Sequence, residues 1–483
     1  MKLKERLRGI VAAVATAALA LSVAPVTAMA DTIGGNSVTI NNVESGDSVT
    51  LYQVVKTVVN EQNVATNAFV TEGFGLNFET GWTEANKESA ANTIAAYVNQ
   101  HGDQWGDDGF TKYGPETATS SSITFEGVDA GQYLVVVTSD SDSTRVYQNT
   151  IVTVEPSTEG GVFGPNDEVP NTENSATLKF TDLDEDENGS AVDKLINGKD
   201  AVDDVDKGDE VTFTITTTVP RYTVNGRTFK LTDTMSEGFV DPTTPTVWFG
   251  GAEATEDNTL VAGTDYILGS ASGFFDTITL TDTGLFRAAG QTLHVSYKAT
   301  LGDSAVYSDS ETNTVLLTFS KNSFEEAPTG SAEDTVYLTV YGITFTKQNA
   351  DNEPLQNAVF QIQDASGAVI YDGLTTGLDG VITLDGALAA GQTYTLVETS
   401  APAGYKPIQN MTFMIASGAD SDEDGVKEGY LYSLNGGVIV DEENDIFSSL
   451  PETGGTGTVA LTVVGVGLMA GAAFLVMRSR KEN

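Results

Sequence analysis

The sequence contains no cysteine and only two histidines, His101 and His294. Without thiols the chain cannot form disulfide bonds, cysteine nucleophiles or thiolate zinc sites. So few imidazoles also leave little general base to activate a nucleophile. We therefore expect no enzyme, no resident metal and no cofactor, and any covalent stiffening must use other side chains.

Basic residues are scarce as well. The chain carries 24 Lys and Arg against 68 Asp and Glu, for a formal net charge of −44. Nucleic acid phosphates require cations, so this balance argues against a nucleic-acid partner. The acidic excess favours a solvated surface that repels neighbouring acidic surfaces.

The N-terminal end is typical of an exported protein. A basic start precedes an apolar run over residues 10–23, and a small-residue cleavage site ends at Ala30. This pattern predicts a secretory signal peptide over residues 1–30. The mature chain would then begin at Asp31.

The C-terminal end begins with the pentapeptide Leu450-Pro451-Glu452-Thr453-Gly454. The uncharged stretch 459–477 follows it, and as a helix rising about 1.5 Å per residue it is long enough to cross a bilayer core. A basic tail after residue 477 would stay on the cytoplasmic side. The sequence thus predicts a membrane-spanning helix next to the pentapeptide.

These three parts, in this order over residues 450–483, resemble the cell-wall sorting signal of Gram-positive surface proteins. The resemblance implies that a sortase cleaves between Thr453 and Gly454 and joins the Thr453 carboxyl to an amine. It also implies a secreted protein that spans the membrane before cleavage and is afterwards anchored covalently to the cell wall.

The length between the two ends predicts about three domains. The first, 31–165, has strand patterns at residues 37–40, 48–55, 122–125, 132–137 and 149–154, and one short helix near 83–99. A Pro- and Gly-containing linker follows at 155–175. The second domain, 176–335, and the third, 336–447, alternate apolar with polar residues, which is typical of antiparallel β-sandwiches. We expect an all-β chain of tandem sandwiches.

A lysine stands where the third domain should have a core residue. Lys347 shares a strand face with two apolar neighbours, so its side chain should point inward. Glu398 alternates with apolar residues in the same way. Asn444 is an even number of residues from Val438 and Val440, so in a strand it should lie on the same face as these valines. Asn435 is an alternative asparagine for this position.

A buried lysine, carboxyl and asparagine can form an amide bond without an external enzyme. Burial lowers the pKa of the lysine and yields a neutral amine nucleophile. Burial also raises the pKa of the carboxyl, which can then donate a proton to the amide carbonyl. Attack expels ammonia and leaves a Lys–Asn isopeptide bond.

The motifs of the third domain are Thr344-Phe345-Thr346-Lys347, Pro354-Leu355-Gln356-Asn357-Ala358-Val359-Phe360 and Glu398-Thr399-Ser400-Ala401-Pro402-Ala403-Gly404-Tyr405. They resemble those of a Cna B-type domain, an Ig-like sandwich. The resemblance implies that Lys347 is the bond lysine, Glu398 the catalytic acid and Asn444 the bond asparagine.

The second domain offers the same set of side chains. Lys194, Asp233 and Asn313 each share a strand face with apolar residues, while Lys179 and Lys199 are alternatives to Lys194. The strings Lys194-Leu195-Ile196-Asn197-Gly198-Lys199, Gly208-Asp209-Glu210-Val211-Thr212-Phe213 and Thr232-Asp233-Thr234 resemble the central domain of Gram-positive pilins and fimbrial subunits. That resemblance implies a second isopeptide bond, with Asp233 as its catalytic acid.

In the first domain, Val137 occupies the position that aligns with Glu398 in an internal repeat. Because the carboxyl is missing there, we expect no isopeptide bond in that domain.

The mature chain as a whole resembles a three-domain, sortase-assembled pilin. Shaft subunits of that family end their first domain on V-x-V-Y-P-K, whereas this chain reads Val152-Thr153-Val154-Glu155-Pro156-Ser157. The usual intersubunit lysine is therefore absent, and Lys179 is the favoured replacement.

Three roles stay open within this resemblance: a shaft subunit, a subunit at the tip or base, and a monomeric adhesin that binds a host glycan or matrix ligand. The expected partners are sortase and either peptidoglycan or neighbouring pilin subunits. A wall-anchored glycosidase is less favoured, because small sandwiches offer little room for a cleft.

Two acidic segments, 184–189 and 420–425, match the first half of an EF-hand loop. Each has leucine at the twelfth position, where calcium needs a bidentate glutamate. We therefore interpret both segments as solvated acidic loops and predict no metal site.

Overall fold

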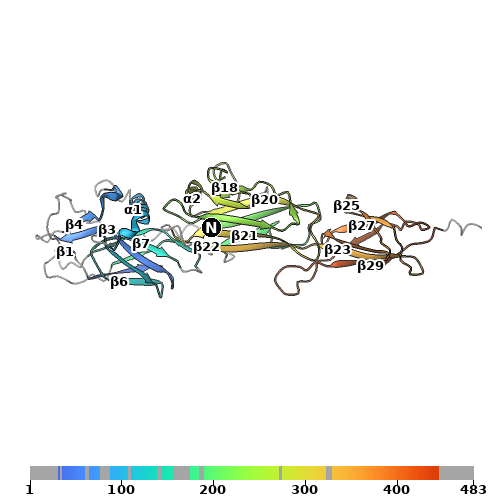
Figure 1. Ribbon diagram of the computed structural model, residues 1–483, viewed down its shortest axis with the longest axis horizontal. Coiled ribbons are helices and arrows are strands. Elements are labelled where there is room, and N and C mark those ends of the chain that lie inside the picture. Colours follow the sequence, from blue (N-terminus) through green and yellow to red (C-terminus); the bar gives the residue numbers. More distant parts are fainter. Residues whose placement is uncertain are drawn as a thin grey trace, which may run out of the picture.

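The computed structural model is elongated, with three β-rich domains following one another in a row (Figure 1). It describes residues 31–32, 35–59, 65–76, 87–106, 110–139, 143–155, 174–183, 190–270, 275–322 and 329–444. The predicted signal peptide, the pentapeptide at 450–454 and the predicted span at 459–477 lie outside these residues. No helix within the described ranges is long and apolar enough to cross a membrane.

The first domain packs a six-stranded sheet against a three-stranded sheet. The larger sheet has the order β1-β3-β7-β9, with β4 and β5 also paired to β3, and the smaller has the order β10-β2-β6. The elements are β1 Asp31–Thr32, β2 Asn36–Asn41, β3 Ser48–Val59, β4 Ala65–Phe69, η1 Glu72–Phe74, α1 Lys87–His101, η2 Gly102–Gln104, β5 Lys112–Thr117, β6 Ser122–Val128, β7 Gly131–Thr138, β8 Arg145–Tyr147, β9 Thr150–Val154, β10 Asn174–Thr177 and β11 Phe180–Asp182.

Strand β7 has apolar side chains on both faces because both faces are covered. Tyr133 and Val135 face the core shared with β2 and β6, whereas Leu134 and Val136 belong to a second cluster with Ile94 of α1. This explains the nearly continuous apolar run in β7. The helix predicted near 83–99 is thus present, and it covers the outer face of the larger sheet.

The first domain extends beyond its predicted end at residue 165. Strand β10 pairs in parallel with β2, and β11 pairs with β8. Residues 174–182 therefore complete the first domain instead of opening the second. The short strands follow a Pro- and Gly-containing segment, so their sequence gave no clear strand signal.

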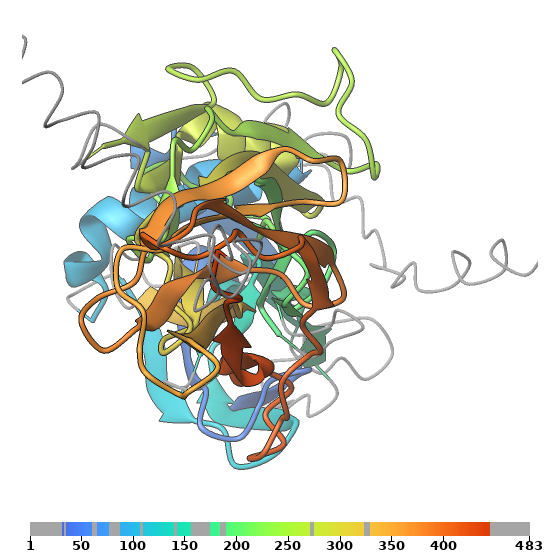
Figure 2. The same cartoon turned by 90° about the vertical axis from the view of Figure 1, so that its right-hand side faces the viewer.

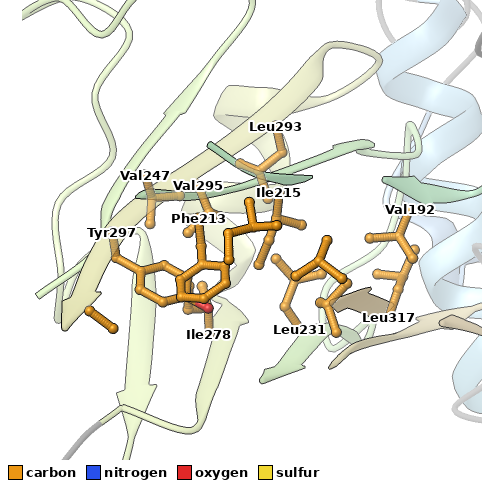
Figure 3. Close-up of a cluster of buried hydrophobic side chains, with 14 of the residues drawn as sticks. Val192, Phe213, Ile215, Leu231, Val247, Ile278, Leu293, Val295, Tyr297 and Leu317 are labelled. Atoms are coloured by element: carbon orange, nitrogen blue, oxygen red, sulfur yellow. The ribbon is translucent and has the colours of Figure 1, made fainter. Parts of the chain in front are cut away.

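The central domain is a sandwich of two sheets ordered β12-β14-β20-β16, with β17 also paired to β20, and β13-β22-β21-β15-β19-β18. Its elements are β12 Val192–Ile196, β13 Ala201–Val202, β14 Glu210–Thr218, β15 Phe229–Met235, β16 Phe239–Val240, β17 Thr246–Phe249, β18 Tyr266–Gly269, β19 Thr277–Leu280, α2 Asp282–Ala288, β20 Thr292–Leu301, β21 Glu311–Ser320 and β22 Thr329–Leu338. Strand β14 alternates buried and half-buried positions as predicted. Inward side chains of both sheets, including Phe213, Leu231 and Leu317, meet in the core (Figure 3).

The third domain is a smaller sandwich of sheets ordered β26-β23-β29 and β25-β24-β27-β28. Its strands are β23 Tyr341–Gln348, β24 Val359–Gln363, β25 Val369–Thr375, β26 Val381–Leu388, β27 Thr393–Ser400, β28 Met411–Met414 and β29 Leu431–Val440. The first and last strands, β23 and β29, are parallel neighbours. Residues that are distant in sequence therefore meet at the end of this pair.

The junction between the first two domains is packed and hydrogen bonded. Val224 of the central domain is buried in the apolar cluster beneath α1. Asn322, just after β21, donates its side-chain amide to the Thr138 hydroxyl over 3.2 Å. These contacts fix the first domain against the end of the central sandwich.

The junction between the central and third domains is built on two aspartates between β13 and β14. Asp206 accepts hydrogen bonds from the Tyr394 hydroxyl over 2.5 Å and from the Ala389 amide over 2.9 Å. Asp203 accepts one from the Tyr341 hydroxyl over 2.9 Å. Seen from the third-domain end, the domains lie behind one another along the long axis (Figure 2).

Candidate functional site: two buried lysine centres

Lys194 lies inside the central sandwich. Strand β12 alternates buried and half-buried residues, so Lys194 shares the buried face with Val192 and Ile196. The side chain is 0% exposed. Burying a charged ammonium group is costly unless it is paired, so its partners determine its state.

Strand β15 supplies the first partner. The Lys194 Nζ donates to Asp233 Oδ2 over 2.5 Å, and the carboxylate is itself buried. Asn313 on the neighbouring strand β21 is 0% exposed. The structure thus brings together all three residues that the sequence predicted for this centre.

A fourth residue, Tyr297 on β20, connects the other three and was missed by the sequence analysis. Its hydroxyl donates to Asp233 Oδ2 over 2.8 Å and accepts from Lys194 Nζ over 3.0 Å. It also accepts from Asn313 Nδ2 over 2.7 Å. The available signal was its strand parity with Val295, since a buried phenol usually needs a polar partner.

Two oxygens of this centre have no partner among the described residues: Asp233 Oδ1 and Asn313 Oδ1. Buried polar atoms are normally hydrogen bonded, so an unpaired one calls for a reason.

Burial lowers the pKa of Lys194, while the adjacent Asp233 opposes that shift. Burial, followed by the neighbouring Asp233 charge, raises the pKa of Tyr297 well above its usual value. The amine therefore loses its proton more easily than a surface lysine does, and the phenol keeps its own.

The competing lysines are at the surface. The Lys199 side chain is 61% exposed and forms an ion pair with Asp204 at 3.9 Å. Lys179 is exposed between β10 and β11, where its carbonyl accepts from the Gln148 amide over 2.9 Å. Among the three lysines considered for this centre, only Lys194 lies in the core.

Lys347 forms a second centre in the third domain. It lies on the buried face of β23, and its side chain is 0% exposed. Glu398 of β27 places Oε2 3.7 Å from the Lys347 Nζ, and that oxygen also accepts from the Ile408 amide over 2.8 Å. The predicted Lys347–Glu398 pairing is thus present.

The residue that contacts Lys347 most closely is Asp441, and the prediction that Asn444 does so is wrong. The Lys347 Nζ donates a short hydrogen bond to Asp441 Oδ1, and both side chains are 0% exposed. Asn444 is exposed and lies beyond the end of β29. The alternative, Asn435, is also exposed, and its amide donates to Val438 O over 2.8 Å within its own turn.

Strand parity explains this difference. Ile439 is buried and lies opposite Lys347 in the β23–β29 pair, whereas Val440 is 47% exposed. Asp441 has the parity of Ile439, so it points inward. Val440 and Asn444 are both at even-numbered positions, on the opposite side of the strand from Asp441. The valines used for the prediction therefore lie on the outer face and not on the inner one.

Burial raises the pKa of both carboxyls in this centre, and the Lys347 charge opposes the shift in each case. Glu398 Oε1 and Asp441 Oδ2 have no hydrogen-bond partner among the described residues. A protonated carboxyl next to a buried amine is the arrangement from which an amide can form with loss of water.

The remaining predicted sites are simpler. Val137 is buried in the apolar core of the first domain. Asp420 and Asp424 accept backbone hydrogen bonds from Gly425 and Val426, so this segment is a self-bonded acidic loop. The other acidic segment, 184–189, lies outside the described residues.

Two family descriptions match parts of the chain. Residues 448–483 match the LPXTG cell wall anchor motif, which includes Leu450–Gly454 and confirms the predicted sorting signal and cell-wall location. Residues 342–427 match the prealbumin-like fold domain of the SpaA family, which contains both Lys347 and Glu398. The anchor implies a sortase and the cell wall as partners of the chain.

A curated relative is fimbrial subunit type 2 of Actinomyces naeslundii, 25% identical over 332 residues. The match covers 57% of this chain and 58% of the relative, so the chain spans little more than half of that protein's length.

The chain is also similar to solved pilin structures. The T6 backbone pilin of Streptococcus pyogenes, described as a modular three-domain structure, is matched at TM-score 0.57 and 22% identity over 79% of this chain and 80% of that chain. The major pilin SpaD of Corynebacterium diphtheriae is matched at TM-score 0.49 and 18% identity over 85% of this chain and 98% of that chain. The sheets described above and the match to the T6 backbone pilin confirm the predicted all-β fold of tandem sandwiches.

Proposed function

We propose that the protein is a pilus subunit that is joined through Thr453 by a sortase and is cross-linked internally in two of its domains. The observation that carries this proposal is a wall-anchored backbone-pilin fold with a fully buried lysine, held against a carboxyl, in each of two sandwich cores. Removing either partner of such a pair leaves an unpaired buried charge, which is strongly unfavourable.

In the central domain the proposed bond joins Lys194 to Asn313. Asp233 accepts a proton from the ammonium group and polarises the Asn313 carbonyl through a hydrogen bond from that proton, which it keeps. The free amine attacks the side-chain carbon of Asn313, and ammonia leaves. The 2.5 Å contact between Lys194 and Asp233 supports this first proton transfer.

In the third domain the proposed bond joins Lys347 to Asp441, in place of the Asn444 bond predicted from the sequence. Glu398 serves as the acid that polarises the Asp441 carboxyl. Because the electrophile is a carboxyl, the leaving group is water. The raised pKa values of both carboxyls support a protonated acid at this position.

Each cross-link forms once and stabilises the chain that makes it, so we propose that the protein turns over no substrate. For head-to-tail assembly we propose Lys179 as the acceptor of the Thr453 carboxyl of a neighbouring subunit. Its exposure between β10 and β11, at the end of the first domain, supports this role. A host glycan or matrix ligand stays a prediction.

Intact-mass measurement of the processed chain tests the cross-links. We expect a mass below the unmodified formula by one ammonia and one water. Lys194→Ala should restore the ammonia alone, and Lys347→Ala the water alone. A wild-type mass equal to the unmodified formula would refute both bonds.

Immunoblotting of cell-wall extracts tests assembly. A ladder of high-mass species is expected from a pilus subunit, and Lys179→Arg should collapse it while Lys199→Arg leaves it intact. A single band from the unmodified chain would instead identify a monomeric adhesin.

A further inference from the structure

The hydroxyl of Tyr297 lies at the centre of the Lys194 site and contacts every other member. Lys194 Nζ, Asp233 Oδ2 and Asn313 Nδ2 all lie within 3.0 Å of this one oxygen. A phenol can donate one hydrogen bond and accept two, so its full capacity is used here. The nucleophilic nitrogen and the leaving nitrogen thus both donate to the same hydroxyl oxygen, whose own proton is exchangeable.

The ring of Tyr297 is held by packing independently of these polar contacts. The residue is 2% exposed, with ring centroids 5.3 Å from Phe213 and 4.8 Å from Phe275. Figure 3 shows the ring lying beside Phe213 within the core. The hydroxyl is therefore fixed in position before any bond forms.

Amide formation from Lys194 and Asn313 requires two separate proton transfers. The ammonium group must lose one proton to become a nucleophile, and its nitrogen must lose a second once the C–N bond has formed. The leaving Asn313 Nδ2 must gain one proton to depart as ammonia. Asp233 can take the first proton, but it does not contact Nδ2 in the described structure, whereas Tyr297 does.

We propose that Tyr297 is a catalytic residue for the central cross-link, relaying a proton from Lys194 Nζ to the departing Nδ2 of Asn313. As the new Lys194 Nζ–Asn313 Cγ bond forms, the tyrosine oxygen takes a proton from Nζ and passes its own to Nδ2. The Asn313 Cγ–Nδ2 bond then breaks, ammonia leaves, and Asp233 keeps the first proton. The starting ion pair thereby becomes neutral amide, neutral acid and ammonia.

This inference rests on the proposed cross-link and deepens it. Burial and Asp233 raise the pKa of Tyr297, so the phenol starts and ends protonated, as a relay requires. Within the described part of the chain, Lys347 contacts two carboxylates and no hydroxyl. The proposed bond at Lys347 releases water from a carboxyl. Of the two centres, the one with the tyrosine is therefore the one that must release ammonia.

The test is Tyr297→Phe in the full chain, with the Lys194–Asn313 peptide quantified by mass spectrometry at intervals after a pulse of synthesis. Loss of a general acid–base group typically slows a reaction by about 100-fold or more, so a slowing of that size is expected. Formation of the Lys347–Asp441 bond in the same molecules should keep its wild-type rate. The matched control is Tyr222→Phe, which removes a buried hydroxyl that donates to Ser320 O over 2.8 Å in the same domain.

A second pair of variants, both carrying Asn313→Asp, distinguishes a proton relay by Tyr297 from simple positioning of Lys194. In Asn313→Asp the leaving group is water from a carboxyl, so adding Tyr297→Phe should slow that bond far less than it slows the native one. Equal slowing in both backgrounds, or no slowing in either, would overturn the relay. If the wild-type chain forms no Lys194–Asn313 peptide at all, the proposed function itself fails along with it.

Should the phenylalanine variant not fold, fluorotyrosine placed at position 297 retains the ring and hydroxyl while lowering the phenol pKa. The relay predicts an altered rate of bond formation in that chain. An unchanged rate would refute it.

Discussion

The two lysine centres differ in the groups that surround the buried amine. Lys194 faces an amide and a single carboxyl, whereas Lys347 faces two carboxyls. The identities of Lys194, Asp233 and Asn313 followed from strand parity, because each lies within a regular strand with apolar neighbours on its inner face. The role of Tyr297 could not be predicted in this way. A tyrosine is common in the core of a sandwich, and only the structure shows its hydroxyl in contact with three polar groups.

The Asp441 assignment gives a direct prediction at this scale. Asp441→Ala should abolish the third-domain cross-link and, by leaving Lys347 with one partner fewer, destabilise the domain by about 3–5 kcal/mol beyond any loss from the bond itself. Peptide mapping and thermal unfolding would measure both effects. The control is Asn444→Ala, which should change neither; loss of the bond in that variant would restore the original asparagine assignment.

The raised pKa values of Glu398 and Asp441 predict how an uncrosslinked third domain responds to pH. An acid whose folded-state pKa exceeds its unfolded value binds more protons when folded. Stability is therefore greatest below the unfolded pKa, about 4 for these groups, and declines as pH rises through the folded value. The unfolding temperature of Lys347→Ala should fall between acidic and neutral pH, and a flat profile would contradict this.

The matched control for that experiment adds Glu398→Gln and Asp441→Asn to Lys347→Ala. With no buried carboxyl left to titrate in the centre, the decline should disappear. Calorimetry across the same buffers would compare the two chains.

At the scale of elements, strand β29 shows where parity reasoning breaks down. Leu434 and Ile439 are both buried although one position is even and the other odd. Between them Asn435, Gly436 and Gly437 all have positive φ, and the pairing with β23 shifts register there. An irregularity that adds a residue to one strand reverses which side chains face inward. The Asn-Gly-Gly segment can be found in the sequence. That it turns the Asp441 side chain toward the core could not be predicted from it.

Gly437 offers a test of this register shift. Its φ is +91°, and an added Cβ would lie 3.0 Å from the Ser433 hydroxyl. Gly437→Ala should destabilise the third domain by about 1–3 kcal/mol, the usual cost of holding a non-glycine residue in such a conformation. It should also slow formation of the Lys347–Asp441 bond.

Thermal unfolding and peptide mapping would follow both consequences. Gly251→Ala is the control, because that glycine has no unusual φ and nothing within 4 Å of an added Cβ. Equal stability of the two variants would argue against a strained turn in β29.

At the scale of the whole molecule, the all-β class, the order of the domains and the helix of the first domain were predictable from alternation and composition. The return of β10 and β11 to the first domain was not, because pairing with β2 and β8 is a long-range property. The interdomain contacts of Asp203 and Asp206 could not be predicted either. From sequence alone an acidic loop is expected to face solvent, and only the structure shows that the third domain contacts it.

The Asp206 contacts predict a stiff joint between the central and third domains. Asp206→Ala removes the acceptor of the Tyr394 hydroxyl and the Ala389 amide. The distribution of distances between the two domains should broaden as a result. Because the chain lacks cysteine, one cysteine engineered in each domain can carry spin labels for that measurement.

Glu256→Ala, which removes an exposed acid between β17 and β18, is the control and should leave the distribution narrow. If Asp206→Ala also leaves it unchanged, the joint is held by other contacts.

The placement of the two lysines near the start of their domains governs how far the protein can stretch. With both amides in place, the shortest covalent route from Lys179 to Thr453 leaves the main chain at Lys194, rejoins it at Asn313, leaves again at Lys347 and rejoins at Asp441. A pulling force that follows this route bypasses most of the central and third domains. Pulling on the two ends therefore cannot unfold these domains. Under load the molecule should give way first in the segments outside these loops.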